Sequence, residues 1–159
     1  MDDGANMMFM REAIKLAGEN VETGSGGPFG AVIVKDGRII ATGTNKVTAS
    51  NDPTAHAEVV AIRNACLELG SFQLDGCEIY CSCEPCPMCL GAIYWARPKK
   101  IYYACDKSDA ASIDFDDGFI YSEIAKPLDK RNLAIEQLLR DEGYEVFKKW
   151  KESDDKIQY

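Results

Sequence analysis

Histidine and long apolar runs are what this sequence has least of. It contains a single histidine, His56, among 159 residues. The first twenty residues mix short apolar groups with Asp2, Asp3 and Glu12, which is typical of neither a secretory signal nor a membrane span. We therefore predict a cytoplasmic protein without a membrane partner.

Positive charge is also in short supply. Lys and Arg number 18 against 26 Asp and Glu, which gives a net charge of −8 at pH 7. This balance provides no general phosphate-neutralising surface, although it is compatible with a local basic patch. We expect no nucleic-acid partner, and a polyanion such as tRNA is disfavoured.

Internal repeats, linkers and low-complexity tracts are absent from the sequence as well. Hydrophobic residues make up 46% and charged residues 28% of the chain, which is ordinary globular composition. A chain of this length buries most of its apolar surface without help from disulfides. We predict a single domain over residues 1–159.

Cysteine, in contrast, is well represented. The chain has seven cysteines, which are Cys66, Cys77, Cys81, Cys83, Cys86, Cys89 and Cys105. An odd number without an export signal argues against a disulfide framework. Metal binding or burial explains these residues better.

Hydrophobic periodicity and turn residues predict alternating helices and strands. Predicted helices cover residues 5–21, 55–69, 87–96, 120–125 and 133–142, and predicted strands cover 31–34, 39–41, 77–81 and 101–104. Residues 106–118 read as a polar loop, and 144–159 as a charged helix and tail. This order predicts an α/β sandwich with a sheet between helical layers.

Local signals set several boundaries of these elements. Asp36-Gly37 favours a tight hairpin between the first two strands. Thr54 is a candidate N-cap for the helix that ends at Gly70. Pro87 suits the first position of the next helix, which places Cys86 at its cap.

Two short motifs carry metal chemistry. They are His56-Ala57-Glu58 and Pro85-Cys86-Pro87-Met88-Cys89. A catalytic zinc takes three nitrogen or sulfur ligands and leaves a fourth position open. Both motifs are predicted at helix N-termini, where the helix dipole favours thiolates. We predict one Zn²⁺ per chain, held by His56, Cys86 and Cys89.

Glu58 is expected to move protons rather than bind the metal. Residues two apart on a helix point in different directions, so Glu58 does not chelate a metal held by His56. His-x-Glu followed by Pro-Cys-x-x-Cys is the signature of zinc-dependent base deaminases, in which the glutamate is the general acid and base.

Other interpretations of these residues remain open. Taken singly, His56 reads as a core or surface histidine and Glu58 as a first-turn carboxylate. Cys83, Cys86 and Cys89 are equally spaced and also suggest a cysteine-only zinc or iron–sulfur site. A structural zinc module that binds a partner is the non-enzymatic alternative. The remaining Cys66, Cys77 and Cys105 are expected to be small core residues.

Together these motifs and their surroundings resemble bacterial guanine deaminases, within the cytidine-deaminase-like superfamily. The matching stretches are GGPFGA at 26–31, NDPTAHAE at 51–58, CEPCPMC at 83–89, WARP at 95–98 and FDDGFIY at 115–121. The resemblance implies a three-layer α/β/α sandwich with a central, mostly five-stranded mixed sheet. It also implies hydrolysis of guanine to xanthine and ammonia, with cytosine or tRNA-adenosine deamination as the alternatives.

The resemblance further assigns residues around the base. Asn45 would hydrogen-bond the purine edge, and Phe29 and Trp95 would form apolar walls. Asp117 would contact the amino-bearing edge and assist proton transfer. Each has a plainer alternative, since Asn45 and Asp117 lie in turn-rich stretches and aromatic residues pack in cores.

The resemblance also implies a role for the C-terminal tail. Residues 148–156 are too charged to form ordinary core, and the plain interpretation is a frayed end. By resemblance, Tyr159 would instead close over the base as a lid. The tail, from about residue 130 to 159, would be exchanged between the subunits of a homodimer.

Overall fold

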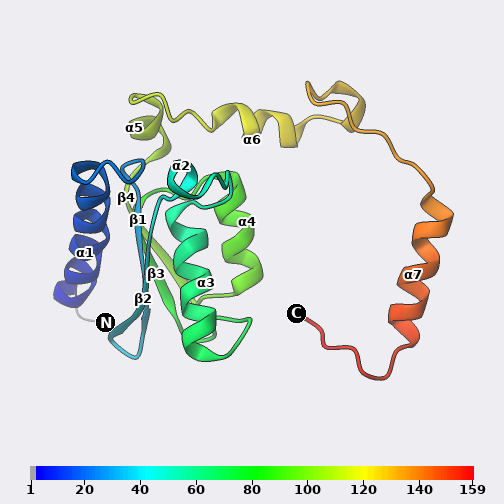
Figure 1. Cartoon of the computed structure of the whole chain (residues 1–159), viewed down its shortest axis with the longest axis horizontal. Helices are drawn as coiled ribbons and strands as arrows, with labels where there is room; N and C mark the ends of the chain where they lie inside the picture. Colours follow the sequence, from blue (N-terminus) through cyan, green and yellow to red (C-terminus); the bar gives the residue numbers. More distant parts are fainter. Residues whose placement is uncertain (1–2) are drawn as a thin grey trace. The chain divides into compact units, whose positions relative to one another are not determined.

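The computed structural model describes residues 3–159. The chain forms two compact units, unit 1 up to Gly118 and unit 2 from Phe119 to Tyr159 (Figure 1). Within the described residues, no helix has the length and apolar character needed to cross a membrane.

A mixed sheet forms the middle layer of unit 1. Its strands are β1 (Gly30–Lys35), β2 (Arg38–Thr44), β3 (Glu78–Cys83) and β4 (Lys100–Cys105), in the order β2-β1-β3-β4. Strand β1 runs antiparallel to both β2 and β3, whereas β3 and β4 are parallel. The predicted hairpin is confirmed, because Asp36 and Gly37 between β1 and β2 have φ values of 49° and 74°.

Helices cover both faces of this sheet. The covering helices are α1 (Asp3–Glu22), α3 (Ala57–Leu69) and α4 (Pro87–Ala96), and unit 1 also contains the short helices α2 (Val47–Ser50) and α5 (Lys107–Ala111). Figure 1 shows α1 on one face, with α3 and α4 on the other. The predicted α/β/α sandwich is therefore confirmed. Unit 2 contains α6 (Gly118–Ala125, which begins at the boundary), the 3₁₀ turn η1 (Leu128–Lys130) and α7 (Arg140–Glu152).

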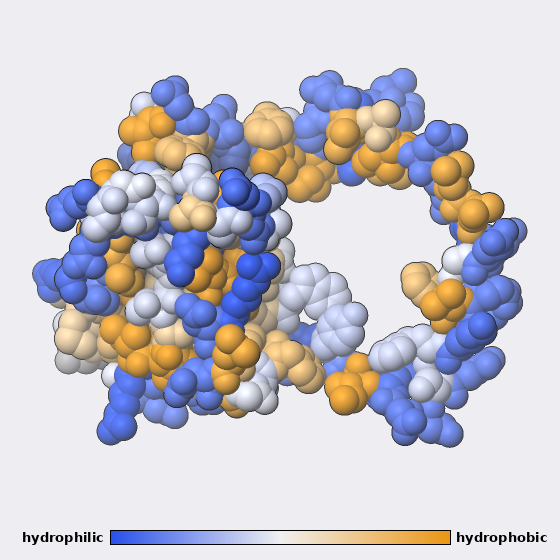
Figure 2. All heavy atoms as spheres, viewed as in Figure 1, coloured by the Kyte–Doolittle hydropathy of each residue, from blue (hydrophilic) through white to orange (hydrophobic). Residues whose placement is uncertain are grey.

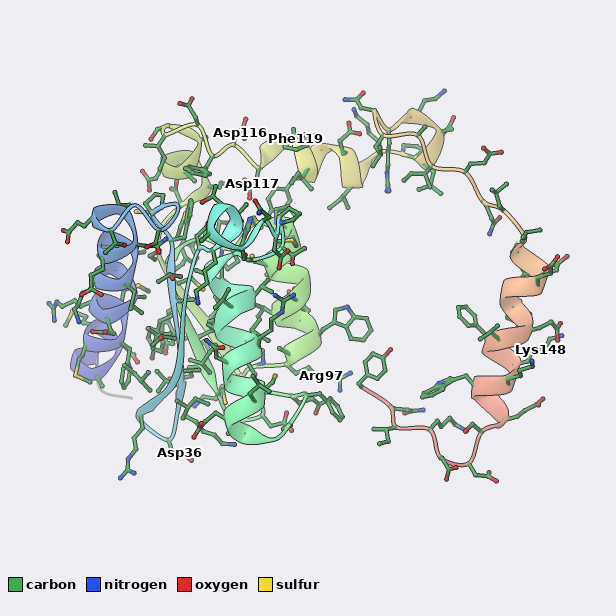
Figure 3. The ribbon with its side chains drawn as sticks, in the orientation of Figure 1. Asp36, Arg97, Asp116, Asp117, Phe119 and Lys148 are labelled. Atoms are coloured by element: carbon green, nitrogen blue, oxygen red, sulfur yellow. The ribbon has the colours of Figure 1, made fainter. Side chains whose placement is uncertain are left out.

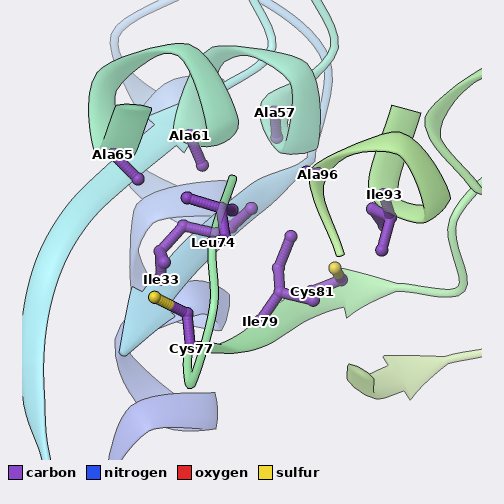
Figure 4. Close-up of a cluster of buried hydrophobic side chains, with 11 residues drawn as sticks. Ile33, Ala57, Ala61, Ala65, Leu74, Cys77, Ile79, Cys81, Ile93 and Ala96 are labelled. Atoms are coloured by element: carbon purple, nitrogen blue, oxygen red, sulfur yellow. The ribbon is translucent and has the colours of Figure 1, made fainter. Parts of the chain in front are cut away.

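Two apolar clusters hold the three layers together. The larger packs Ile33, Ile79 and Cys81 of the sheet against alanines of α3 and against Ile93 (Figure 4). The smaller lies under α1 and includes Phe9 and Tyr80. Gly43 lets α3 approach β2 closely, because a Cβ there would collide with the carbonyl oxygen of Ala57. This contact sets the position of the start of α3.

The sheet has four strands, so the expectation of mostly five is wrong. After β4 the chain enters a helix instead of returning to the sheet edge. Asp106 accepts hydrogen bonds from the backbone N–H groups of Ser108 and Asp109, and the side chain of Asp109 accepts one from Asp106 N–H. This capping box starts α5 inside the segment that we expected to be a loop.

Two helix boundaries also differ from the sequence-based expectation. The N-cap of α3 is His56; Thr54 is held in the preceding turn by the carboxylate of Asp52, which accepts hydrogen bonds from its N–H and its hydroxyl group. Residues 133–139 of the helix expected over 133–142 are not helical, and α7 runs from Arg140 to Glu152. The apolar residues of 133–139 are exposed (Figure 2). A helix of that length needs packing on an apolar face to be stable.

Candidate active site

The start of α3 presents the first motif. His56 is the N-cap residue, with extended backbone angles and no side-chain capping hydrogen bond, so its imidazole is left for other partners. Glu58 lies in the first turn of the same helix and is buried. The turn of residues 51–55 and the close contact at Gly43 fix where this helix begins.

The start of α4 presents the second motif. Cys86 is the N-cap, as predicted, and its Sγ accepts a hydrogen bond of 3.5 Å from the backbone N–H of Cys89. Pro87 occupies the first turn, where its missing N–H costs nothing. Both thiols therefore lie at the positive end of the α4 dipole, which favours the thiolate form.

The two helix starts bring one histidine and two cysteines together. Nδ1 of His56 lies 3.5 Å from Sγ of Cys86 and 3.5 Å from Sγ of Cys89. The ligand atoms of the three residues all lie within 4.8 Å of one another. Zn–N and Zn–S bonds of about 2.0 and 2.3 Å in a tetrahedron separate such ligands by about 3.5 to 3.8 Å. The residues present fit a zinc ion with one further coordination position.

The cysteine-only alternative does not match this arrangement. Among the described residues, the group of three His, Cys, Asp or Glu ligands close enough to share a metal is His56, Cys86 and Cys89, and Cys83 is not part of it. Sγ of Cys83 instead donates a weak hydrogen bond to the carbonyl oxygen of Asp106, at 3.6 Å.

The three ligand residues shift one another's pKa values strongly. A hydrogen bond from the Cys89 side chain, followed by one from His56, lowers the pKa of Cys86 to about 4, against the opposing effect of burial. The Cys86 thiolate in turn raises the pKa of Cys89, and it raises that of His56 through a hydrogen bond. This donor set is suited to a divalent cation, which stabilises both thiolates together with a neutral imidazole.

Glu58 lies beside this group and is not part of it. It is only 8% exposed, and burial is the main reason that its pKa is raised. An interaction of Glu58 with Cys89 places the carboxyl next to the ligands. A buried carboxyl beside an open coordination position is suited to accept and return a proton.

Asn45, predicted to bind the purine, is buried where β2 ends. Its backbone N–H donates to the carbonyl oxygen of Phe29 at 3.2 Å, and its Oδ1 accepts from the N–H of Val47 at 3.2 Å. The second bond fixes which way the side-chain amide faces. The structure therefore joins the segments that carry two of the predicted base-contacting residues.

Phe29, predicted as an apolar wall, is half-buried and packs against the larger core cluster. The ring of Phe115 stands edge-on to it, with centroids 5.0 Å apart at 87°. Phe115 therefore extends the same wall. The sequence assigned no role to Phe115, and its place beside Phe29 is decided by the loop after α5.

Asp117 ends that loop. Partial burial, followed by the negative charge of Cys86, raises the pKa of Asp117. The carboxyl therefore interacts electrostatically with one of the metal-binding residues. Figure 3 shows Asp116 and Asp117 at the end of unit 1 opposite to Asp36. Asp116 accepts a hydrogen bond from the N–H of Gly118, which shapes the turn.

The roles predicted for Trp95 and Tyr159 are not tested by the geometry of the site. Trp95 is 64% exposed on α4, so it is not core, and its role as a wall stays a prediction. Tyr159 belongs to unit 2, and its role as a lid also stays a prediction.

The remaining cysteines divide between core and surface. Cys77 and Cys81 are buried, and Cys66 packs against the larger core cluster. Cys105 is exposed, so the expectation that it is core is wrong. It ends β4, an edge strand of the four-stranded sheet, and helical packing does not cover its side chain.

Three such ligands with a carboxylate beside them form the active-site plan of zinc-dependent base deaminases. The family model for the cytidine and deoxycytidylate deaminase zinc-binding region matches residues 5–105. The chain therefore belongs to this family of zinc-dependent deaminases.

Individual proteins of this family differ in how similar they are to the chain and in how much of it they cover. The chain is 58% identical over 151 residues to the guanine deaminase of Bacillus subtilis, covering 95% of this chain and 97% of that one. The X-ray structure of guanine deaminase from Bacillus subtilis superposes with a TM-score of 0.95 at 56% identity, covering 100% and 99% of the two chains. A tRNA-specific adenosine deaminase of Agrobacterium fabrum is 43% identical over 100 residues, covering 63% of each chain.

Proposed function

We propose that this protein hydrolyses guanine to xanthine and ammonia. The observation that carries the proposal is the His56, Cys86 and Cys89 group with Glu58 beside it, in a chain 58% identical over 95% of its length to a guanine deaminase. The likeness extends through unit 2 and is not confined to the zinc-binding region.

The reaction needs a nucleophile and two proton deliveries. When bound, zinc supplies a water molecule acidified enough to attack at neutral pH. Glu58 would take up a proton from a water molecule there and deliver it to ring nitrogen N3 while the oxygen bonds to C2. The second water proton goes to the exocyclic nitrogen, and the C2–N bond breaks to release ammonia. The product carries oxygen at C2 and hydrogen at N3, which is xanthine.

The other predicted site residues are assigned roles in binding the purine and in proton transfer. Asn45 offers its amide to the polar edge of the purine, and Phe29 covers an apolar face together with Phe115. Asp117, close enough to feel the charge of Cys86, assists proton delivery to the leaving amino group. Trp95 on α4 forms a further wall of the base pocket.

Deamination of adenosine in tRNA is the second candidate, because of the 43% identity to a tRNA-specific adenosine deaminase. That likeness covers 63% of this chain and includes the metal motif that different deaminases share. The net charge of −8 disfavours an anticodon arm as substrate. Guanine is therefore the better candidate.

An ammonia-release assay tests the proposal. Purified zinc-loaded protein is incubated with guanine, adenine, cytosine and their nucleosides, and with a tRNA anticodon stem-loop. Ammonia and xanthine in equal amounts from guanine alone is the expected result. Release from the stem-loop or from cytosine, with none from guanine, would replace guanine as the substrate.

The same proposal includes a cytoplasmic homodimer whose C-terminal tails are exchanged, with Tyr159 closing over the base. Its support is the large apolar surface of unit 2, where Leu139, Phe147 and Trp150 are all more than half exposed. Apolar side chains in such number mark an interaction surface. Analytical ultracentrifugation checks the dimer, and mixing of two differently impaired variants checks the exchange.

A further inference from the structure

A buried amide on α1 lies where an apolar residue would be expected. The face of α1 that covers the sheet carries Phe9, Ala13 and Ala17, and Asn20 continues this face one turn later. Asn20 is only 5% exposed. A polar side chain is retained at such a place only when its hydrogen bonds are made.

Asn20 makes two hydrogen bonds that join distant segments. Its Nδ2 donates to the carbonyl oxygen of Gly27 at 2.9 Å and to that of Asn45 at 3.0 Å. Both N–H groups of one amide are thus directed at two backbone carbonyls, one on the loop that leads into β1 and one at the end of β2. A side chain without two donors could not replace this arrangement.

The two joined segments are the ones that carry base-contacting residues. Gly27 lies two positions before Phe29, whose carbonyl oxygen accepts a hydrogen bond from the N–H of Asn45 at 3.2 Å. Gly26 packs against this junction so closely that a Cβ would collide with the carbonyl oxygen of Asn45. We call this junction of Asn20, Gly26, Gly27 and Asn45 the Asn20 clamp.

We propose that Asn20 is a positioning residue for purine recognition. It holds the backbone of Asn45 against the loop before Phe29, so that the amide of Asn45 and the ring of Phe29 keep a fixed spacing around the base. Asn20 acts through Asn45 and does not itself touch the substrate. The inference rests on the proposed function, in which Asn45 binds the purine edge.

The location of Asn20 on α1 distinguishes the proposed positioning role from a purely structural one. The hydroxyl of Tyr80 is a comparable buried polar group under α1, and it donates to Asn6 at 2.7 Å. Asn6 lies in the first turns of α1, whereas Asn20 lies at the other end, beside the loop that leads to Phe29. Loss of either group removes buried hydrogen bonds, but only loss of Asn20 releases Asn45.

The test compares Asn20→Leu with Tyr80→Phe in the zinc-loaded protein. Leucine keeps the branched shape and the number of side-chain heavy atoms of asparagine, with two larger methyl groups in place of the amide, and it removes both donors. We expect Asn20→Leu to retain zinc and to raise KM for guanine by about tenfold, with kcat changed less than about threefold, because binding rather than the chemical step depends on Asn45. Tyr80→Phe should leave KM unchanged.

A double-mutant cycle shows whether Asn20 acts through Asn45. If it does, adding Asn20→Leu to Asn45→Ala leaves KM at the value of Asn45→Ala alone. Effects that multiply would overturn the inference. So would a KM for Asn20→Leu equal to that of the parent.

Two further measurements keep the inference testable. Gly26→Ala pushes on Asn45 with Asn20 intact and should raise KM similarly; this variant decides the matter if Asn20→Leu does not fold. Hydrogen–deuterium exchange at the Asn45 amide should quicken by about tenfold in either variant, since the clamp opens locally. If the parent releases no ammonia from guanine, the proposed function fails, while unchanged exchange at Asn45 overturns the clamp itself.

Discussion

The two units of the chain differ in where their apolar side chains lie. Unit 1 buries its own core on both faces of the sheet and brings together the metal-binding group and Glu58. In unit 2, none of the described residues 119–159 is buried. A unit with no core of its own is stabilised by what it packs on. The chemistry therefore belongs to unit 1, and unit 2 is expected to contribute closure.

The largest effect should come from removing a metal ligand of unit 1. Cys86→Ala leaves two ligands, so we expect bound zinc to fall from one per chain to near zero, and deamination to be lost with it. Metal analysis of dialysed protein measures this. Cys66→Ala, a half-buried cysteine of the core, is the matched control and should keep its zinc.

A smaller loss is expected when the proton carrier is changed and the metal is kept. Glu58→Gln is nearly isosteric and cannot accept the water proton, so kcat should fall by about 10²- to 10⁴-fold at unchanged zinc content. Glu68→Gln, on the exposed end of α3, should behave like the parent. Ammonia release from Glu58→Gln near the parent rate would remove Glu58 from the mechanism.

Deleting residues 153–159 tests unit 2. We expect zinc and the fold of unit 1 to be retained, with kcat/KM for guanine reduced by about tenfold or more, because the lid is gone. Asp155→Asn, a single change within the same tail, is the control. Unchanged kinetics after the deletion would contradict the lid.

Mixing two impaired proteins tests whether the tail is exchanged. The truncated chain has an intact Glu58, and Glu58→Gln has an intact tail. If tails cross between subunits, heterodimers formed on co-refolding combine one good site with one good tail and regain activity. No gain above the separate rates would mean that each tail serves its own chain.

The smallest effect concerns alkaline pH and should arise in unit 1 alone. Tyr80 is fully buried, and burial, followed by a hydrogen bond to Glu78, raises its pKa. Above about pH 10 the unfolded chain loses this proton first, so stability is complete below that pH and falls as pH rises, by at most about 1.4 kcal/mol per unit. Urea unfolding from pH 8 to 11 measures how the free energy of unfolding changes with pH. This change should be smaller for Tyr80→Phe than for the control Tyr144→Phe, which replaces an exposed tyrosine of α7.

Sequence patterns predicted the elements of unit 1 well because local and tertiary preferences agree there. Asp36-Gly37 forms the hairpin, Gly70 ends α3 in the left-handed conformation, and Cys86 caps α4. In unit 2 the apolar pattern predicted a helix over residues 133–142, but residues 133–139 are not helical. Hydrophobic periodicity shows which side chains need to be buried, but it does not show whether another surface is present to bury them.

Within the site, the metal ligands could be named from spacing because zinc chemistry restricts the residue types and helix starts restrict their positions. The roles of Phe115 and Asn20 could not be predicted from spacing in this way. Phe115 reaches Phe29 through a loop whose course depends on the cap of α5. Asn20 carried one weak signal, a polar residue on the inward face of an amphipathic helix, but its partners lie up to 25 residues away in sequence.

The sequence by itself thus predicted the alternation of helices and strands, and it named candidates for the zinc ligands and for the proton carrier, since each depends on residue type and short-range spacing. Only the tertiary structure decided that the sheet has four strands, that His56 rather than Thr54 caps α3, and that Asn20 holds the segments of Asn45 and Phe29 together. These features depend on contacts between parts of the chain far apart in sequence, where close packing and the need to satisfy buried polar groups choose among several locally acceptable conformations.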